Sequence, residues 1–228
     1  GLDQTITFGG TVQVAVPGAD IFLDAGLDDG TNSSWEDSLS KWNLSLNTGV
    51  AFVANTGSNH PGITSAYNFP GGTSGASGAD GTSLHDMGGG EDTQPITLEI
   101  WFKPTLSASY PANGQILWET GGGTGLGVFY NNGFVETAHD SNAGQLSSDV
   151  SSLTGDYIQV VITYDTGSTT NNYHLYINGE LKASGSRNDT VMCGGDGSGL
   201  GNKGESNAGG AGSGDASTES FEGSIAIF

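Results

Sequence analysis

A segment of nine residues, 96–104, has the most regular alternation in the chain. Ile96, Leu98, Ile100 and Phe102 alternate with Thr, Glu, Trp and Lys, and a proline ends the segment. A period of two is typical of a β-strand that buries one face. Proline lacks a backbone donor and therefore stops a strand ladder. The segment predicts a strand in a sheet with one face against a core.

Similar segments follow one another along the chain, separated by turns rich in Gly, Asn and Asp. Two Asn-Gly pairs, at 132–133 and 178–179, are strong signals for tight β-hairpins. The segment 158–164 is the most apolar and is expected to be a central strand. The segment 38–47 is compatible with a helical turn. We expect strands at 5–8, 12–16, 51–53, 66–69, 96–104, 115–119, 126–130, 134–136, 158–164, 173–177, 180–183 and 221–228.

This pattern predicts an all-β fold, an antiparallel two-sheet β-sandwich with jelly-roll connections. The 228 residues suffice for one large β domain. We expect a strand-like N-terminal extension over 1–18 and one domain over 19–228. The stretches 70–92 and 193–220 are rich in Gly and Ser and predict long loops. Cys193 is the only cysteine, so an intrachain disulfide is excluded.

The chain is strongly acidic. It has 5 Lys and Arg against 25 Asp and Glu, a formal net charge of −20. Such a charge repels nucleic acids and anionic membrane surfaces. No segment approaches the about 20 apolar residues of a membrane helix, so membrane insertion is not expected. The acidity serves solubility, or it gathers divalent cations such as Ca²⁺; both explanations stay open.

Nine motifs, in order from Phe22 to Phe228, resemble one family. They are FLDAG (22–26), WED (35–37), YNFPGG (67–72), TLEIWFKP (97–104), QILWETGG (115–122), YIQVVITYD (157–165), YHLYINGELKAS (173–184), GLGNKG (199–204) and FEGSIAIF (221–228). The chain resembles the laminin-G-like jelly-roll domains of the concanavalin A-like lectin/glucanase superfamily, of the bacterial surface or secreted type. The resemblance implies two facing sheets and ligand contact through rim loops. Glycan binding, adhesion, protein assembly and, in some members, glycan hydrolysis are known activities of such domains.

The resemblance also implies candidate calcium ligands. In pentraxin-like relatives, Ca²⁺ lies in an acidic loop after a strand that ends in Leu-Gly. The matching residues are Asn202, Glu205 and Glu219, although glycines stand at 121–123, near where those relatives add an Asp-Asn pair. Other acidic candidates, which the sequence does not rank, are Asp20, Asp24, Asp28, Asp80 and Asp92.

Catalytic motifs are not recognisable in the sequence. The glucanase relatives carry a Glu with an Asp two residues later, and no Glu here is followed in this way. Glu99 is expected to share its face with Thr97 and Trp101, and Glu119 with Leu117. Residues 199–204 match G-x-G-x-x-G but precede no helix. The scattered residues His60, His85, His139 and His174 are expected to be surface or hydrogen-bonded side chains, not metal ligands or catalytic groups. We therefore expect no enzyme activity; a noncanonical acid pair is the alternative.

Five aromatic residues have two open interpretations. They either form a sugar-stacking platform or pack in the core; they are Trp101, Trp118, Tyr130, Tyr157 and Tyr176. The leading hypothesis is a non-catalytic, secreted or cell-surface module that binds a glycan or an extracellular protein. One alternative is a structural subunit of a filament, sheath or surface layer that self-assembles through its terminal strands. The other is a glycan hydrolase or lyase.

Overall fold

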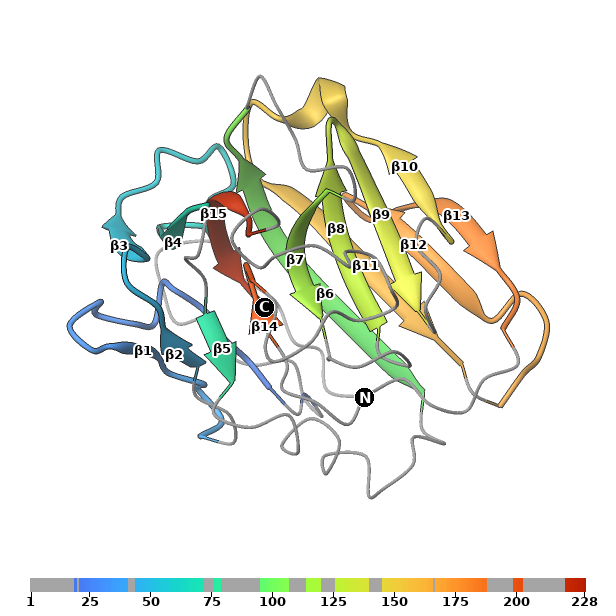
Figure 1. Cartoon of the computed structure of the whole chain (residues 1–228), viewed down its shortest axis with the longest axis horizontal. Coiled ribbons are helices and arrows are strands. Elements are labelled where there is room, and N and C mark those ends of the chain that lie inside the picture. Colours follow the sequence, from blue (N-terminus) through green and yellow to red (C-terminus); the bar gives the residue numbers. More distant parts are fainter. Residues whose placement is uncertain are drawn as a thin grey trace, which may run out of the picture.

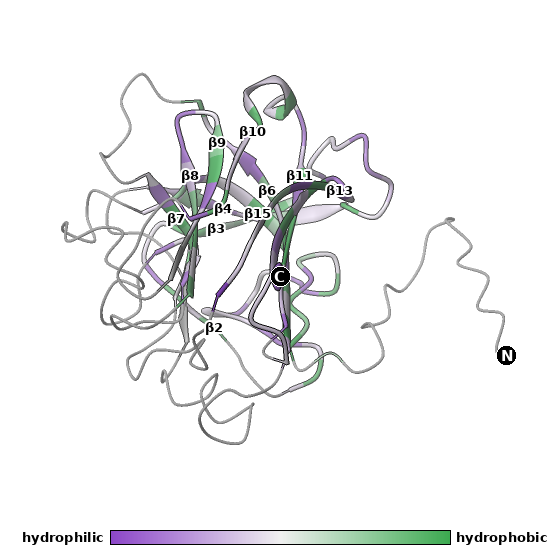
Figure 2. Cartoon of the chain, turned by 90° about the vertical axis from the view of Figure 1, so that its right-hand side faces the viewer, coloured by the Kyte–Doolittle hydropathy of each residue, from purple (hydrophilic) through white to green (hydrophobic). Residues whose placement is uncertain are grey.

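The computed structural model describes residues 19, 21–40, 44–71, 76–78, 95–106, 114–119, 126–139, 145–165, 167–187, 199–202 and 220–228. Within these ranges the chain forms two antiparallel sheets that face each other, with one 3₁₀ turn and no α-helix. Figure 2 views the two sheets edge-on as separate layers. The predicted all-β, two-sheet antiparallel sandwich is confirmed.

The first sheet has eight strands among the described residues. Their order is β1 (Ser34–Trp35), β2 (Leu44–Leu46), β5 (Ala76–Gly78), β14 (Gly199–Leu200), β7 (Gln115–Glu119), β8 (Leu126–Asn131), β9 (Phe134–His139) and β10 (Ser147–Asp149). The 3₁₀ turn η1 (Ser151–Leu153) follows β10. Figure 1 shows β7, β8 and β9 as neighbouring strands in front of β6 and β11.

The second sheet has seven strands in the described ranges. Their order is β13 (Glu180–Gly185), β12 (Tyr173–Ile177), β11 (Ile158–Tyr164), β6 (Ile96–Pro104), β15 (Glu222–Ile227), β4 (Ser65–Pro70) and β3 (Ala51–Ala54). The predicted strand 96–104 is confirmed at both ends. It is the middle strand of this sheet, between β11 and β15, and β11 is likewise an interior strand.

Alternation along β6 assigns its two faces as the sequence predicts. Leu98, Ile100 and Phe102 are buried in the main core, whereas Glu99 and Trp101 on the other face are only half-buried. In the core, the Phe102 ring of one sheet lies 5.8 Å from the Tyr130 ring of the other. The sandwich is therefore held together by apolar side chains that project inward from both sheets.

Both Asn-Gly hairpins are confirmed. The φ angles are +46° and +89° at Asn132-Gly133 and +50° and +77° at Asn178-Gly179. Positive φ at both central residues is typical of the tight turn whose twist matches a β-hairpin. These turns join β8 to β9 and β12 to β13.

One prediction of secondary structure is wrong. Residues 44–46, within the expected helical turn, form β2, which pairs with both β1 and β5. Like β1, β5, β10 and β14, it has only two or three residues, too few to show a period. The predicted strands 5–8 and 12–16 and the extension 1–18 lie outside the described residues, so the domain boundary stays a prediction. No helix among the described residues is long and apolar enough to span a membrane.

Candidate binding face on the seven-stranded sheet

The outer face of the seven-stranded sheet carries a fixed group of polar and aromatic side chains. The Trp101 Nε1–H donates a 2.7 Å hydrogen bond to Glu99 Oε1, and Gln159 Nε2 donates one of 2.6 Å to the same oxygen. Gln159 lies directly opposite Trp101 in the β6–β11 register. The three side chains therefore hold one another in place without help from a loop.

The second oxygen of this carboxylate remains available. Both hydrogen bonds of Glu99 reach Oε1, and within the described part of the chain Oε2 accepts none. Tyr176 of β12 is on the same cross-strand row, because Val161 pairs with Glu99 on one side and with Tyr176 on the other. The face thus carries the half-buried Glu99 carboxylate beside Trp101, and half-exposed Tyr176 lies two strands away, across Val161.

The loop from β3 to β4, residues 55–64, covers one end of this face. The His60 ring meets the Trp101 ring edge-on, with centroids 5.1 Å apart and an interplanar angle of 71°. Below them, a small second core contains the buried residues Ile63, Tyr157 and Ala226. Trp101 packs against the border of this core, so its ring is held from one side.

A shallow, open hollow of about 420 Å³ lies along the loop 55–64 and the start of β4. His60 borders this hollow and also contacts Trp101, whereas Trp101 and Glu99 do not line it. The lining residues are Asn55, Gly57, Ser58, His60, Pro61, Ile63, Thr64 and Ser65.

Asp156 fixes the loop over the sheet. Its Oδ1 accepts hydrogen bonds from Ser58 Oγ (3.0 Å) and Tyr157 N (2.8 Å), and its Oδ2 accepts one from Asn59 N (2.8 Å). Burial by itself would raise the pKa of Asp156, but the hydrogen bonds from Asn59, Tyr157 and Ser58 outweigh it and lower the pKa to about 2. The Asp156 side chain is therefore an ionised carboxylate when it holds the loop in place.

The aromatic platform of five residues is not formed. Trp118 and Tyr130 belong to the main core, and Tyr157 is buried in the second core. Core packing is therefore the correct interpretation for these three. Trp101 and Tyr176 alone among the five are half-exposed, and both lie on the outer face of the seven-stranded sheet.

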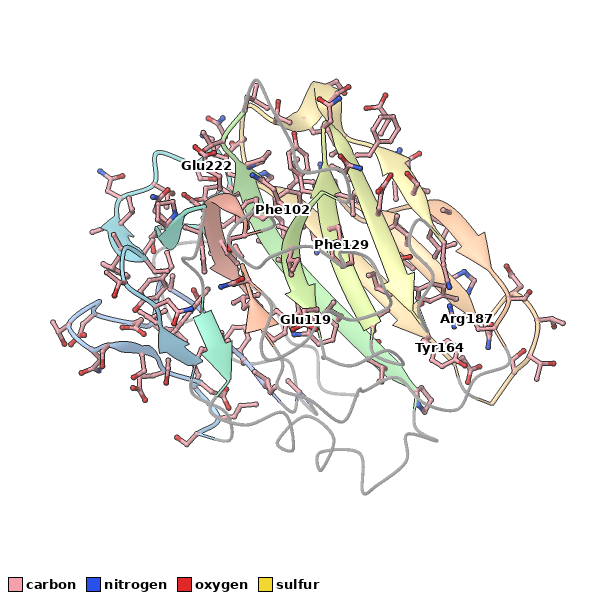
Figure 3. All side chains as sticks on the ribbon, in the orientation of Figure 1. Phe102, Glu119, Phe129, Tyr164, Arg187 and Glu222 are labelled. Carbon is pink, nitrogen blue, oxygen red and sulfur yellow. The ribbon has the colours of Figure 1, made fainter. Side chains whose placement is uncertain are left out.

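The prediction that Glu119 shares a strand face with Leu117 is also wrong. A β-bulge between Ile116 and Trp118 inserts one residue into β7, so Leu117 and Trp118 both contribute to the main core. Because a bulge exchanges the faces that follow it, Glu119 lies on the outer side with Ile116 and Phe129. Glu119 is fully buried there; Figure 3 labels Glu119 and Phe129 on the neighbouring strands β7 and β8. For Glu99, the predicted neighbours Thr97 and Trp101 are confirmed.

The structure locates one of the three predicted calcium ligands. Asn202 follows β14, is buried, and its Oδ1 accepts a 3.1 Å hydrogen bond from Ser220 Oγ. Glu205 and Glu219 lie outside the described residues, as do Asp20, Asp80 and Asp92. An amide oxygen is a suitable calcium ligand, so Asn202 fits the prediction but does not establish it.

The remaining acidic candidates bind backbone groups. Asp24 and Asp28 accept hydrogen bonds from the backbone N–H of Gly26 (2.7 Å) and Gly30 (2.9 Å). Burial raises the pKa of Asp24, and the bond from Gly26 opposes that shift. Within the described ranges, no group of three or more His, Cys, Asp or Glu side chains is arranged to hold a metal ion.

The histidines have different environments. His60 contacts Trp101 as described above, and His174 Nδ1 lies 3.0 Å from Ser184 Oγ, as expected of a hydrogen-bonded histidine. The His139 side chain, His85 and Cys193 lie outside what the structure describes. The contact between His60 and Trp101 joins residues 41 positions apart, 60 and 101, and no sequence motif marks it.

Comparison with known families identifies the fold. The sequence model described as the concanavalin A-like lectin/glucanases superfamily matches residues 75–226, which is more than half of the chain. The chain belongs to this superfamily. The resemblance inferred from the motifs is therefore confirmed, and the superfamily's jelly roll accounts for the two sheets. No curated protein matches the chain.

Solved structures show the same sandwich at low sequence identity. Domain 4 of the extracellular arabinanase AbnA from Geobacillus stearothermophilus, in complex with arabinotriose, is 14% identical; the match covers 91% of this chain and 88% of that one, with a TM-score of 0.52. Trypanosoma rangeli sialidase is 16% identical, with coverage of 91% and 30% and a TM-score of 0.55. The botulinum neurotoxin type G receptor-binding domain is 13% identical, with coverage of 92% and 47% and a TM-score of 0.55. The chain thus spans about a third of the sialidase and half of the toxin domain.

Proposed function

We propose that this chain is a non-catalytic glycan-binding module of a secreted or cell-surface protein. Its binding site is the outer face of the seven-stranded sheet around Trp101. The observation that carries the proposal is the hydrogen-bonded set of Trp101, Glu99 and Gln159 on a half-exposed sheet face. An aromatic ring supplies apolar contact to the C–H surface of a sugar, and carboxylate and amide groups bind its hydroxyls.

The superfamily supports the proposal, since its members include lectins. The arabinanase domain that shares the fold was solved with arabinotriose. A shared fold does not transfer a ligand, and the side chains on the face therefore carry the argument. These side chains are already held by hydrogen bonds, which lowers the entropy that ligand binding must overcome.

The surroundings of Glu99 support a non-catalytic role. Glycosidases use two carboxyl groups that lie about 5–9.5 Å apart. The outward-facing residues next to Glu99 on β6 and β11 are Thr97, Trp101, Gln159 and Val161, none of which is acidic. A single carboxylate among such neighbours binds hydroxyl or charged groups but does not form a catalytic pair.

A glycan array followed by calorimetry on Trp101→Ala tests this function. Because stacked aromatic residues dominate such sites, we expect at least about a tenfold loss of affinity. Phe134→Ala is a matched control, since Phe134 is an exposed aromatic residue in β9 of the other sheet. It should change affinity by less than about twofold. If no glycan binds, or if Trp101→Ala binds as well as the unmodified chain, this proposal fails.

The expected assembly through the C-terminal strand is wrong, because β15 is paired on both sides, with β4 and β6. One observation favours assembly with other copies through the edge strand β3 as a second candidate. This strand is the outermost strand of its sheet in Figure 1. Its residues Ala51–Ala54 include no charge and no proline, and Val53 is exposed. Edge strands usually carry charged residues, prolines or bulges that prevent pairing with another chain. The strand at the opposite edge, β13, carries the ion pair of Lys182 and Glu180 (2.7 Å) and a bulge.

Sedimentation velocity over a range of concentrations tests assembly. The unmodified chain should associate as concentration rises, and Val53→Lys, which adds a charge to the edge, should prevent this. Leu181→Lys on the charged edge β13 is the control and should leave association unchanged. A chain that remains monomeric at the highest concentration contradicts assembly, and leaves glycan binding as the function.

A further inference from the structure

The carboxylate of Glu99 lies where a positively charged group would be bound. Its Oε1 accepts hydrogen bonds from Trp101 and Gln159, while Oε2 is without a donor in the described part of the chain. The Trp101 N–H points at this carboxylate, so the carboxylate lies at the edge of the indole ring. An ammonium group at Oε2 would gain an ion pair with a carboxylate that Trp101 and Gln159 already hold in place.

The charges around this position favour a cationic ligand. The Lys182–Glu180 pair neutralises itself at the edge of the sheet. Lys103 is on the same face of β6, but it follows Glu99 by four residues, roughly 13 Å along a strand. Glu99 makes no ion pair with it. The whole chain adds a formal charge of −20, which attracts cations and repels carboxylated sugars at low ionic strength.

We propose that the face around Glu99 selects glycans that carry a protonated amine, such as oligomers of 2-amino-2-deoxyhexoses, over their N-acetylated and carboxylated counterparts. This inference rests on the proposed glycan-binding function and names the ligand class of the same site. N-acetylation replaces the ammonium group with a neutral amide, so only hydroxyl and stacking contacts remain. A carboxylated sugar would place a second negative charge against Glu99.

Calorimetry with three ligands tests the selection: a glucosamine hexamer, the N-acetylglucosamine hexamer and sialyllactose. The glucosamine hexamer should bind at least about tenfold more tightly than the N-acetylated one, because hydrogen bonds to charged groups are about twice as strong as neutral ones. Added salt should reduce this difference. Sialyllactose should bind most weakly.

Glu99→Gln separates charge from shape. The amide keeps an oxygen that accepts the bonds from Trp101 and Gln159, so the sheet face is retained. We expect this variant to lose about tenfold or more in affinity for the glucosamine hexamer and less than about twofold for the N-acetylated hexamer. Glu180→Gln removes the same charge from an exposed edge residue and should leave both affinities unchanged.

Two results would overturn the selection for amines. One is an equal loss for both hexamers in Glu99→Gln, because Glu99 would then act only as a hydrogen-bond acceptor while the glycan-binding function stands. The other is an N-acetylated hexamer that binds as tightly as the amine, or binding of neither. Failure of the broader function would be recognised separately, by a glycan array that shows no ligand of any kind.

Discussion

The indole N–H of Trp101 donates a 2.7 Å hydrogen bond to the carboxylate of Glu99, two residues earlier on the same strand. Residues i and i+2 of a strand project from one face, so this bond is local and does not depend on a loop. It orients the indole ring and also leaves one carboxylate oxygen available. The most regular strand of the chain therefore provides the scaffold of the sandwich on one side and the proposed site on the other.

Asp156 should control the order of the loop 55–64. In Asp156→Ala the hydrogen bonds from Ser58 and Asn59 are lost, and amide exchange at Asn59 should accelerate by about tenfold or more. Asp149→Ala is the control: Asp149 also accepts a backbone hydrogen bond, from Ser151, but is far from this loop in sequence. Unchanged exchange at Asn59 would show that other contacts hold the loop.

The same loop should loosen in strong acid. The pKa of Asp156 in the folded chain is about 2, below the ordinary 3.8. A lowered pKa contributes stability above pH 3.8, and this contribution is lost as the pH falls through about 2. The amide resonance of Asn59 should titrate with a midpoint near pH 2, and this step should be missing in Asp156→Asn. A midpoint near pH 4 would mean that the hydrogen bonds do not favour the ionised form.

Gly223 should tolerate no side chain. Its φ is +150°, and a Cβ there would lie 2.4 Å from the backbone oxygen of Lys103 and 2.6 Å from the Phe221 ring. Gly223→Ala should lower the free energy of unfolding by about 2–5 kcal/mol, from backbone strain and overpacking. Gly155→Ala, where a Cβ meets no atom within 4 Å, should change it by less than about 1 kcal/mol. Urea unfolding measures both, and equal effects would refute the steric argument.

Asn172 should be needed for the connection between β11 and β12. Its Nδ2 lies within 3.1 Å of the backbone oxygens of Asp165, Ser168 and Arg187, and its Oδ1 accepts from Arg187 N at 2.8 Å. Asn172→Ala should cost about 1–3 kcal/mol, because three partly buried backbone carbonyls lose their donor. Asn172→Asp keeps the acceptor but not the donor, so it should be no more stable in urea unfolding. Recovery of stability in this variant would contradict the role of Nδ2.

Calcium binding is a prediction from family resemblance that calorimetry can test. If Asn202, Glu205 and Glu219 form a site, Ca²⁺ should bind and raise the melting temperature, since a ligand that binds only the folded state stabilises it. Glu205→Gln and Glu219→Gln should each weaken binding. Asp29→Asn is the control, because Asp29 is an exposed carboxylate that binds Thr31. An unchanged melting temperature with Ca²⁺ would exclude the site.

Alternation made several features predictable from the sequence. The two faces of β6 and β11 follow from their period of two, and the Asn-Gly turns follow from the tolerance of these residues for positive φ. Position in the sheet is less local. The sequence around Trp118 and Tyr130 does not show which face of the sheet is covered. These two side chains lie in the core because the opposite sheet packs against them.

Glu119 shows how one extra residue in a strand reverses the predicted face of the residues after it. Strict alternation would put Glu119 on the same face as Leu117, but the bulge after Ile116 puts it on the opposite face. A bulge depends on how two strands pair, which the sequence of β7 does not encode in its own period. The expectation failed because the deciding interaction lies between strands.

The faces of β6 and β11, the tight turns and the acidic charge follow from the residues alone, because each depends on neighbouring residues or on composition. The surroundings of Trp101 depend on the fold. Asp156 binds Asn59, 97 residues earlier in the chain, and thereby places His60 against the indole ring. Such contacts form only when the sheet brings distant segments together, so no local pattern announces them. The strand 96–104 could be predicted from its residues, whereas the surface around Trp101 could be found only in the folded structure.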